Sequence, residues 1–100
     1  MYSIIYSVTA ENDIRAVFDY IAADSRETAV SFMAKMEQSI LTLREFPEIG
    51  HTARYPELKM LGIRILPFEK YLIFYKVDKI LENVNIVRVL HGSRNYRNLF

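Results

Sequence analysis

The stretch KYLIFYKV, residues 70–77, decides the fold of this chain of 100 residues. Along a β-strand, successive side chains point to opposite faces of the sheet. Apolar side chains fall on both faces of this stretch, with Tyr71, Ile73 and Tyr75 on one face and Leu72 and Phe74 on the other. Such a run is typical of a strand in the interior of a sheet. We therefore expect residues 70–77 to be the central strand.

Strand-like runs lie on both sides of this stretch in the sequence. GIRIL (62–66) precedes it, until Pro67 interrupts the pattern, and NVNIVRVLH (83–91) follows it after the turn DKILEN. Because the connections are only about four to six residues long, consecutive strands should pair antiparallel. At the start of the chain, YSIIYSV (2–8) alternates in the way expected of a strand with one well-buried face.

Two amphipathic helices are predicted between the first strand and the others. Thr9 offers an N-cap hydroxyl, and apolar residues follow it at helical spacing: Ile14, Val17, Phe18 and Ile21. After a break at Asp24, Ser25 is placed to cap a second helix, whose apolar stripe is longer: Ala29, Phe32, Met33, Met36, Ile40 and Leu43. Phe46-Pro47 ends it. Since the link between them is so short, the two helices should form an antiparallel hairpin.

The segment 47–61 contains two prolines and a glycine and has no sustained periodicity, so we expect a long irregular connection. The order is then β-α-α-β-β-β, an α+β fold in which a small antiparallel sheet packs on an N-terminal helix hairpin. One domain should span residues 1–100, because a chain of this length has no room for two cores. We expect the hairpin to cover one face of the sheet and to leave the other face and an edge free for another macromolecule.

Composition excludes several classes of protein. No apolar run approaches the roughly 18 residues needed to cross a bilayer, and the N-terminus lacks the basic region and cleavage pattern of a secretory signal. Cysteine is absent, which excludes disulfides and thiolate chemistry, and we expect a cytoplasmic protein with no membrane partner. No metal-ligand spacing or glycine-rich phosphate loop occurs, so we expect neither a metal nor a cofactor.

The formal net charge of +1 conceals an uneven distribution. Residues 1–50 contain four bases and eight acids, a net charge of −4, whereas residues 51–100 contain nine bases and four acids, a net charge of +5. A basic half would attract phosphates or an acidic peptide. Small domains also segregate charge in this way by chance, so this observation alone leaves both interpretations open.

Three motifs in fixed order carry a resemblance to a known family: FPEIGH (46–51), GIRILPFEKYLIFYKV (62–77) and NIVRVLHGSRNY (85–96). With the helix hairpin, they resemble the RelE/ParE superfamily, the toxins of type II toxin–antitoxin modules often labelled plasmid stabilisation proteins. The similarity covers about residues 2–96. The VLHG-x-R ending is more similar to the ParE branch. Each fragment alone is a weak signal, and their order and spacing together are a strong one.

The resemblance implies a toxin that binds DNA gyrase and traps it with cleaved DNA, without catalysing a reaction itself. It also implies a cognate antitoxin, usually encoded next door, whose flexible C-terminal segment lays a helix and a strand over the toxin. An uncovered edge strand would allow homodimers or toxin–antitoxin hetero-oligomers. Candidate partner-binding residues are the bases and apolar side chains of the second half: Arg54, Arg88, Arg97, Leu99 and Phe100.

The RelE branch implies a different activity, a ribosome-dependent mRNA endonuclease that needs no metal. The residues at hand form a chemically sufficient set, with His91 as acid or base, Arg64 and Arg94 stabilising charge at the phosphate, and Tyr96 stacking on a base. Arg54 would complete the phosphate clamp. In ParE-like members the ribonuclease residues of the RelE branch are generally missing. A third alternative is a family member that binds its antitoxin and is not toxic.

Structural interpretations compete with each functional one. His91, beside Gly92, could hydrogen-bond the turn that follows the strand. Arg88 could extend its charged end to solvent while its stem stays buried, or it could pair with an acidic residue of a helix. Leu99 and Phe100 are expected to dock on the protein's own surface unless they form a contact. His51 is expected to interact with a helix C-terminus.

Overall fold

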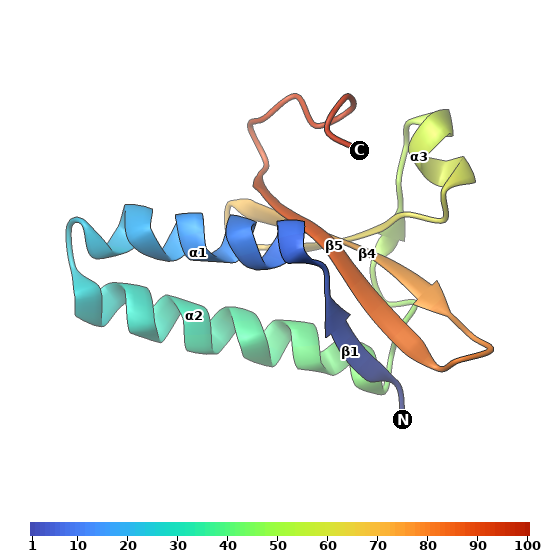
Figure 1. The fold of residues 1–100 in the computed structure, drawn as a ribbon, viewed down its shortest axis with the longest axis horizontal. Coiled ribbons are helices and arrows are strands. Elements are labelled where there is room, and N and C mark those ends of the chain that lie inside the picture. Colours follow the sequence, from blue (N-terminus) through green and yellow to red (C-terminus); the bar gives the residue numbers. More distant parts are fainter.

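The computed structural model describes all residues, 1–100, as one five-stranded sheet with a helix hairpin packed against it (Figure 1). The elements in chain order are β1 (Ser3–Tyr6), α1 (Val8–Ala22), α2 (Arg26–Leu41), the 3₁₀ turn η1 (Thr42–Arg44), β2 (His51–Thr52), α3 (Pro56–Met60), β3 (Arg64–Phe68), β4 (Tyr71–Asp78) and β5 (Asn83–His91). The strand order across the sheet is β1-β5-β4-β3-β2. β4 is the central strand and pairs antiparallel with both β3 and β5, as KYLIFYKV predicts. The α+β fold class is confirmed.

The first strand departs from the prediction of an all-antiparallel sheet, because β1 runs parallel to β5 with Ser3 opposite Asn83 and Tyr6 opposite Ile86. Short connections force antiparallel pairing only between strands that follow one another in sequence. β1 and β5 are the first and last strands, so that rule does not constrain their direction. The pairing leaves the other side of β1 as an edge of the sheet.

Side-chain caps define both helix starts. Ser7, rather than the expected Thr9, caps α1 by accepting a hydrogen bond from the Ala10 N–H at 2.9 Å. Ser25 caps α2 as expected, with the Thr28 N–H as donor. The helices bury the predicted stripe against one face of the sheet, in a core that contains Ala10, Met36, Ile40, Leu43, Ile73, Tyr75, Val84, Ile86 and Val89. Burying each large side chain of this kind stabilises the fold by roughly 1.5–3 kcal/mol.

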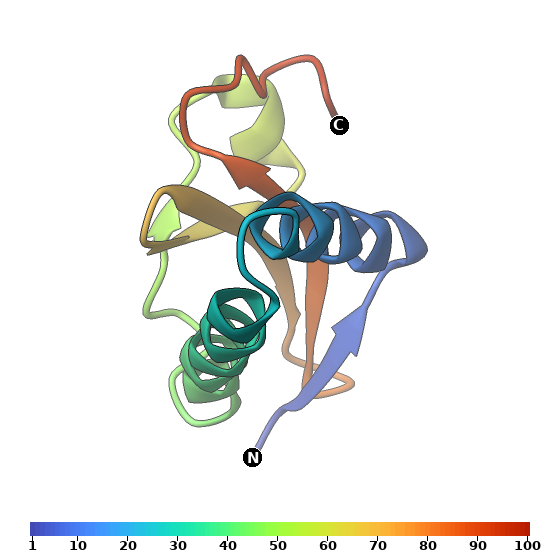
Figure 2. The same cartoon turned by 90° about the vertical axis from the view of Figure 1, so that its left-hand side faces the viewer.

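The opposite face of the sheet is covered too, so the expectation of a free face is wrong. A second core contains Ala53, Leu58, Ile63, Ile65, Phe74 and Leu90, with side chains of the C-terminal segment packed against it. In Figure 2, α3 and the C-terminal segment (lime and red) lie on the other side of the sheet from α2. The segment 47–61 is therefore not structureless, because it contributes β2 and α3 to this covering layer.

A β-bulge at Val87 shifts the second half of β5. Tyr75 of β4 lies opposite Ile86, whereas Phe74 lies opposite Arg88, so Val87 is the extra residue. Beyond the bulge the alternation of faces is reversed, which turns His91 towards the helix side of the sheet.

No helix of the chain has both the length and the apolar character needed to cross a bilayer.

Candidate functional site

His91 lies at the end of β5 and organises the turn that follows it. Its Nδ1 lies 2.7 Å from Ser93 Oγ and accepts a hydrogen bond from the Ser93 N–H at 3.1 Å. The Gly92 N–H donates to the Lys70 carbonyl at 2.8 Å. Because Nδ1 is the acceptor, a neutral imidazole has its proton on Nε2. These contacts are those of a histidine that stabilises a turn, and they leave only Nε2 for other chemistry.

Arg94 shares a shallow hollow of about 180 Å³ with His91, between α1 and the end of β5. Tyr20 and Tyr71 line the same hollow, and the ring of Tyr71 lies edge-on to His91 at 5.3 Å. Burial, with the nearby Tyr20 as a smaller cause, raises the pKa of Tyr71. No local sequence pattern connects Tyr20 to residues 91–94, so its place in this hollow could not be predicted from the sequence.

Arg64 does not join this group. Its guanidinium donates to the carbonyl of Gly50 at 2.8 Å and to that of Glu48 at 2.9 Å, so it holds the loop before β2. Arg64 lies opposite Tyr75 of β4, whereas His91 lies opposite Tyr71 of the same strand. At about 3.3 Å per residue, Arg64 and His91 are therefore separated by roughly 13 Å along the direction of β4.

The buried Tyr75 hydroxyl completes the anchor of this loop by accepting from the Gly50 N–H at 2.9 Å. Burial raises the pKa of Tyr75, and the hydrogen bonds from Gly50 and Arg64 oppose that rise. A Cβ on Gly50 would lie 2.6 Å from the Tyr75 hydroxyl and 2.7 Å from the Ile65 carbonyl, so the position requires glycine. The P-x-I-G motif therefore positions a loop and supplies no catalytic group.

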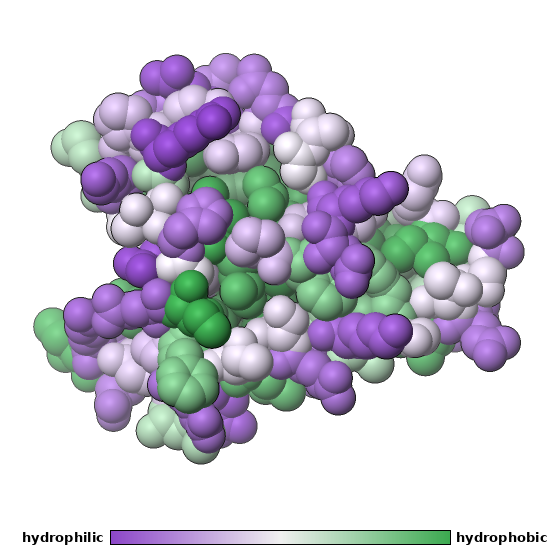
Figure 3. Space-filling model, turned by 180° about the vertical axis from the view of Figure 1, so that it is seen from behind, coloured by the Kyte–Doolittle hydropathy of each residue, from purple (hydrophilic) through white to green (hydrophobic).

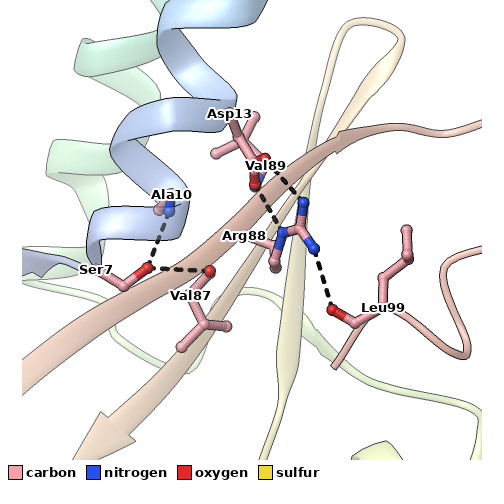
Figure 4. A network of polar contacts seen from close by, with 7 residues as sticks. All are labelled: Ser7, Ala10, Asp13, Val87, Arg88, Val89 and Leu99. Atoms are coloured by element: carbon pink, nitrogen blue, oxygen red, sulfur yellow. Dashed lines mark hydrogen bonds and ion pairs between the residues drawn. The ribbon is translucent and has the colours of Figure 1, made fainter.

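Arg88 makes an internal ion pair (Figure 4). Its Nε and Nη2 each donate to one oxygen of Asp13 at 2.9 Å, and Nη1 donates to the Leu99 carbonyl at 3.1 Å. Asp13 also accepts the Val89 N–H at 3.0 Å. The hydrogen bond to Asp13 raises the pKa of Arg88. The guanidinium thus links α1, the bulged part of β5 and the C-terminal segment.

The C-terminal segment packs on the sheet rather than projecting into solvent. The ring of Tyr96 lies 4.9 Å from Phe74 and 5.6 Å from Tyr55, and the ring of Phe100 lies 5.0 Å from Phe74. Leu99 packs against the same core. Tyr96 is therefore already stacked within the protein, and Leu99 and Phe100 dock on the protein's own surface.

Two further arginines of the predicted set lie on the outside of this layer. Arg97 forms an ion pair with Glu57 of α3, and that hydrogen bond lowers the pKa of Glu57. Its guanidinium also lies 4.8 Å from the centre of the Tyr55 ring. Arg54 donates to the Tyr55 hydroxyl at 3.1 Å. His51 is exposed on β2, and its Nδ1 lies 3.1 Å from the carbonyl of Thr52 in the same strand, in place of the expected contact with a helix C-terminus.

The structure thus brings His91 and Arg94 together and keeps Arg64 and Tyr96 elsewhere, in internal contacts. No three His, Cys, Asp or Glu side chains converge in a way that would hold a metal ion. The described geometry offers no assembled set of acid, base and phosphate clamp.

Comparison with known proteins gives a family. A sequence model of the ParE toxins of type II toxin–antitoxin systems, parDE, matches residues 4–96. The chain belongs to the ParE toxin family. No curated protein matches it in a separate search.

Solved structures of both branches share the fold of this ParE-family chain. A chromosomal ParDE system from P. aeruginosa aligns with a TM-score of 0.72 and 20% identity, over 91% of this chain and 96% of that one. The RelBE2 toxin–antitoxin complex from Mycobacterium tuberculosis aligns with a TM-score of 0.63 and 26% identity, over 90% and 96%. The intact E. coli RelBE complex gives a TM-score of 0.64 with 15% identity, over 94% and 100%. The fold is therefore common to the two branches and does not by itself distinguish their targets.

Proposed function

We propose that the protein is a stoichiometric toxin that binds DNA gyrase, traps it with cleaved DNA, and is neutralised by a cognate antitoxin. The observation that carries the proposal is the match of the ParE toxin model across residues 4–96. The separation of Arg64 from His91 and the internal packing of Tyr96 support a binding mechanism over a catalytic one. Such a protein would act in the cytoplasm, where gyrase and DNA are found.

An antitoxin partner is supported by the relatives, since the matched structures from P. aeruginosa and M. tuberculosis are toxin–antitoxin systems. The chain offers two features that suit a wrapping peptide. One is the outer edge of β1, a template for strand addition beyond Tyr2, whose N–H and carbonyl are bonded to Arg44. The other is a hollow of about 580 Å³ with apolar residues Ile14, Phe18 and Met33 between α1 and α2. Such a partner would yield a hetero-oligomer.

A ribosome-dependent nuclease is the second candidate, favoured by one observation. His91 and Arg94 line the same hollow, so an imidazole and a cation stand close together. If the protein is a nuclease, His91 would act as the acid or base in RNA cleavage and Arg94 would stabilise the charge on the phosphate. Arg64 and Tyr96 would first have to leave their present contacts.

A gyrase supercoiling assay with the purified protein tests the proposal. We expect loss of supercoiling together with gyrase-dependent linear DNA, and we expect His91→Ala to retain both effects. Unaffected gyrase alongside cleaved mRNA on translating ribosomes, lost in His91→Ala, would establish the nuclease instead. Unimpaired growth of bacteria that express the folded chain alone would leave only a non-toxic antitoxin binder.

A further inference from the structure

A shallow hollow of about 190 Å³ lies between α3, the start of β3 and the β4–β5 turn. Its polar side chains are those of Glu48, Thr52, Lys59, Arg64 and Lys79, and we call these five residues the basic hollow. α3 and the turn lie at the right in Figure 1. From behind, in Figure 3, the outline of the molecule is indented at the left, between two lobes with hydrophilic (purple) side chains on both rims. The hollow is therefore open to another molecule.

The basic hollow has an excess of positive charge. Its lining contains three cations, Lys59, Arg64 and Lys79, and one carboxylate, Glu48, a net charge of +2. A second carboxylate, Asp78, precedes Lys79 in the chain, and its Oδ1 accepts two backbone N–H groups of the turn at 3.0 Å. Even with Asp78 included, the net charge is +1. An anion is therefore attracted to this hollow.

The larger hollow between α2 and the β3–β4 turn, about 780 Å³, also contains lysines but is electrically balanced. Lys35 and Lys70 line it together with Glu27 and Glu69, a net charge of zero. The hollow between α1 and α2 is lined by two carboxylates and one cation. The positive excess is therefore a property of the basic hollow and does not follow from the presence of lysines alone.

The cations of the basic hollow are only partly compensated within the protein. Lys79 lies 3.3 Å from Glu48, in a pair whose side chains are 68% and 54% exposed. Lys59 forms no ion pair, and Arg64 donates only to neutral backbone carbonyls, those of Glu48 and Gly50. Like charges gathered in this way repel one another, so a bound anion would relieve a repulsion that the free protein retains.

The hydrogen bonds of Arg64 indicate which anion fits. Arginine binds a carboxylate best through two parallel N–H groups of its guanidinium. Nε and Nη2 of Arg64 already donate to backbone carbonyls, so this residue contributes mainly a fixed charge. Lys59 and Lys79 are compact charges of the kind that bind phosphate oxygens, and the Thr52 hydroxyl adds a neutral donor. This set favours a phosphate over the carboxylates of an acidic peptide.

We propose that the basic hollow binds one phosphate of a nucleic-acid backbone. Its volume of about 190 Å³ is below the roughly 300–1,000 Å³ of sites for drug-sized ligands, as expected where a single group of a longer chain enters. Such a contact positions a protein on a nucleic acid without reading its sequence. The inference goes beyond the proposed function, because DNA held by gyrase and mRNA on the ribosome both present phosphodiesters.

The test measures binding of the purified protein to a short fluorescent DNA duplex and to a single-stranded RNA by anisotropy. K59Q/K79Q removes two cations of the basic hollow, and K35Q/K70Q is the matched control, since it removes two exposed lysines of the balanced hollow. We expect K59Q/K79Q to raise the Kd about tenfold and to reduce the slope of log K against log salt by about 1, the value for one phosphate. The control should lose much less affinity. Urea unfolding midpoints should agree, because exposed charges contribute little to stability.

Thr52→Val provides a variant without a change of charge. It removes the neutral donor of the basic hollow and should weaken binding in the same direction as K59Q/K79Q, by less. Tighter binding of the duplex than of the RNA would assign the phosphate to DNA, and the reverse would assign it to RNA; either result supports the site.

Equal loss of affinity in K59Q/K79Q and K35Q/K70Q would overturn the inference, since the effect would then be one of net charge alone. A glutamate-rich peptide that displaces the nucleic acid from wild type at equal charge would overturn it too, because the occupant would then be a protein. So would NMR shifts of Thr52 and Lys59 with inorganic phosphate in a protein that binds neither nucleic acid. Gyrase that is unaffected by the protein would refute the proposed function and leave this inference standing.

Discussion

The two faces of the sheet are covered in different ways. On one face, two capped helices bury a regular apolar stripe that includes Met36 and Ile40. On the other face, a five-residue helix and an irregular C-terminal segment pack on Phe74 and are fastened by polar contacts, chiefly those of Arg88. The first layer is held by packing over long elements, and the second by a few separate attachments.

This difference predicts an uneven distribution of stability. Local opening requires little free energy where few apolar contacts hold a segment and more where a helix is packed along its length. We therefore expect the C-terminal segment to open without the rest of the fold, whereas the helix hairpin should separate from the sheet only on global unfolding.

The largest effect is expected from Ile40→Ala on the helix face. Ile40 is 1% exposed within the first core, so its truncation should lower the free energy of unfolding by about 2–5 kcal/mol. Urea denaturation measures this change. The matched substitution on the other face is Leu99→Ala, and because the Leu99 side chain is less buried, its truncation should lower the free energy of unfolding by less. Equal losses of unfolding free energy in the two variants would contradict the expected difference in stability between the two faces.

Asp13→Asn should have the next largest effect, because it removes the ion pair and leaves a partly buried guanidinium without its carboxylate. Breaking a fully buried pair costs about 3–5 kcal/mol, and the side-chain exposure of 19% for Arg88 reduces our expectation to about 2 kcal/mol. Relative to wild type, Asp13→Asn should increase the rate of amide hydrogen exchange more in residues 94–100 than in α2. Uniform acceleration across the chain would indicate that the pair does not act on the segment specifically.

Gly50→Ala should destabilise the protein by about 1–2 kcal/mol, since the new Cβ overlaps the Tyr75 hydroxyl and the Ile65 backbone. The matched control is Gly92→Ala, where the nearest atom to an added Cβ lies 3.3 Å away. The thermal midpoint of each variant provides the measurement, and a Gly50→Ala midpoint at or above wild type would contradict the proposed anchor of the loop.

The smallest effect concerns acid pH. The pKa of Glu57 is lowered by the hydrogen bond from Arg97, so the pair contributes fully above the ordinary value of 4.5 and is lost as the pH falls through the lowered pKa. NMR shifts of residues 96–98 should therefore change as the pH falls through this lowered pKa, below 4.5. Glu57→Gln should abolish that change, and a change that persists in the variant would assign it to another group.

The regular half of the fold could be predicted from sequence because its signals are local. The stripe of α2 repeats at helical spacing, and the apolar run of β4 marks the centre of the sheet. No local pattern predicts the bulge at Val87. The sequence led us to expect that Arg88 could pair with a helix acid, but it could not identify Asp13 as that acid, because the two residues lie far apart in the chain. One available signal was missed, since Pro56 stands at the first position of α3, where proline is favoured.

The candidate site was predictable only in part, for the same reason. His91 and Arg94 are close in sequence and meet in the structure, whereas Arg64 and Tyr96 were grouped with them by chemistry and lie in separate contacts. Arginine is equally able to bind a phosphate or a backbone carbonyl, and only the packing of the chain decides which it meets.

We propose that the protein acts by binding gyrase and not by cutting RNA. The most direct test of this mechanism is the amount of DNA covalently linked to gyrase in bacteria after induction of the chain. We expect these complexes to accumulate within the time in which growth stops, and to accumulate equally with His91→Ala. Growth arrest without gyrase-linked DNA, accompanied by cleaved mRNA, would contradict it.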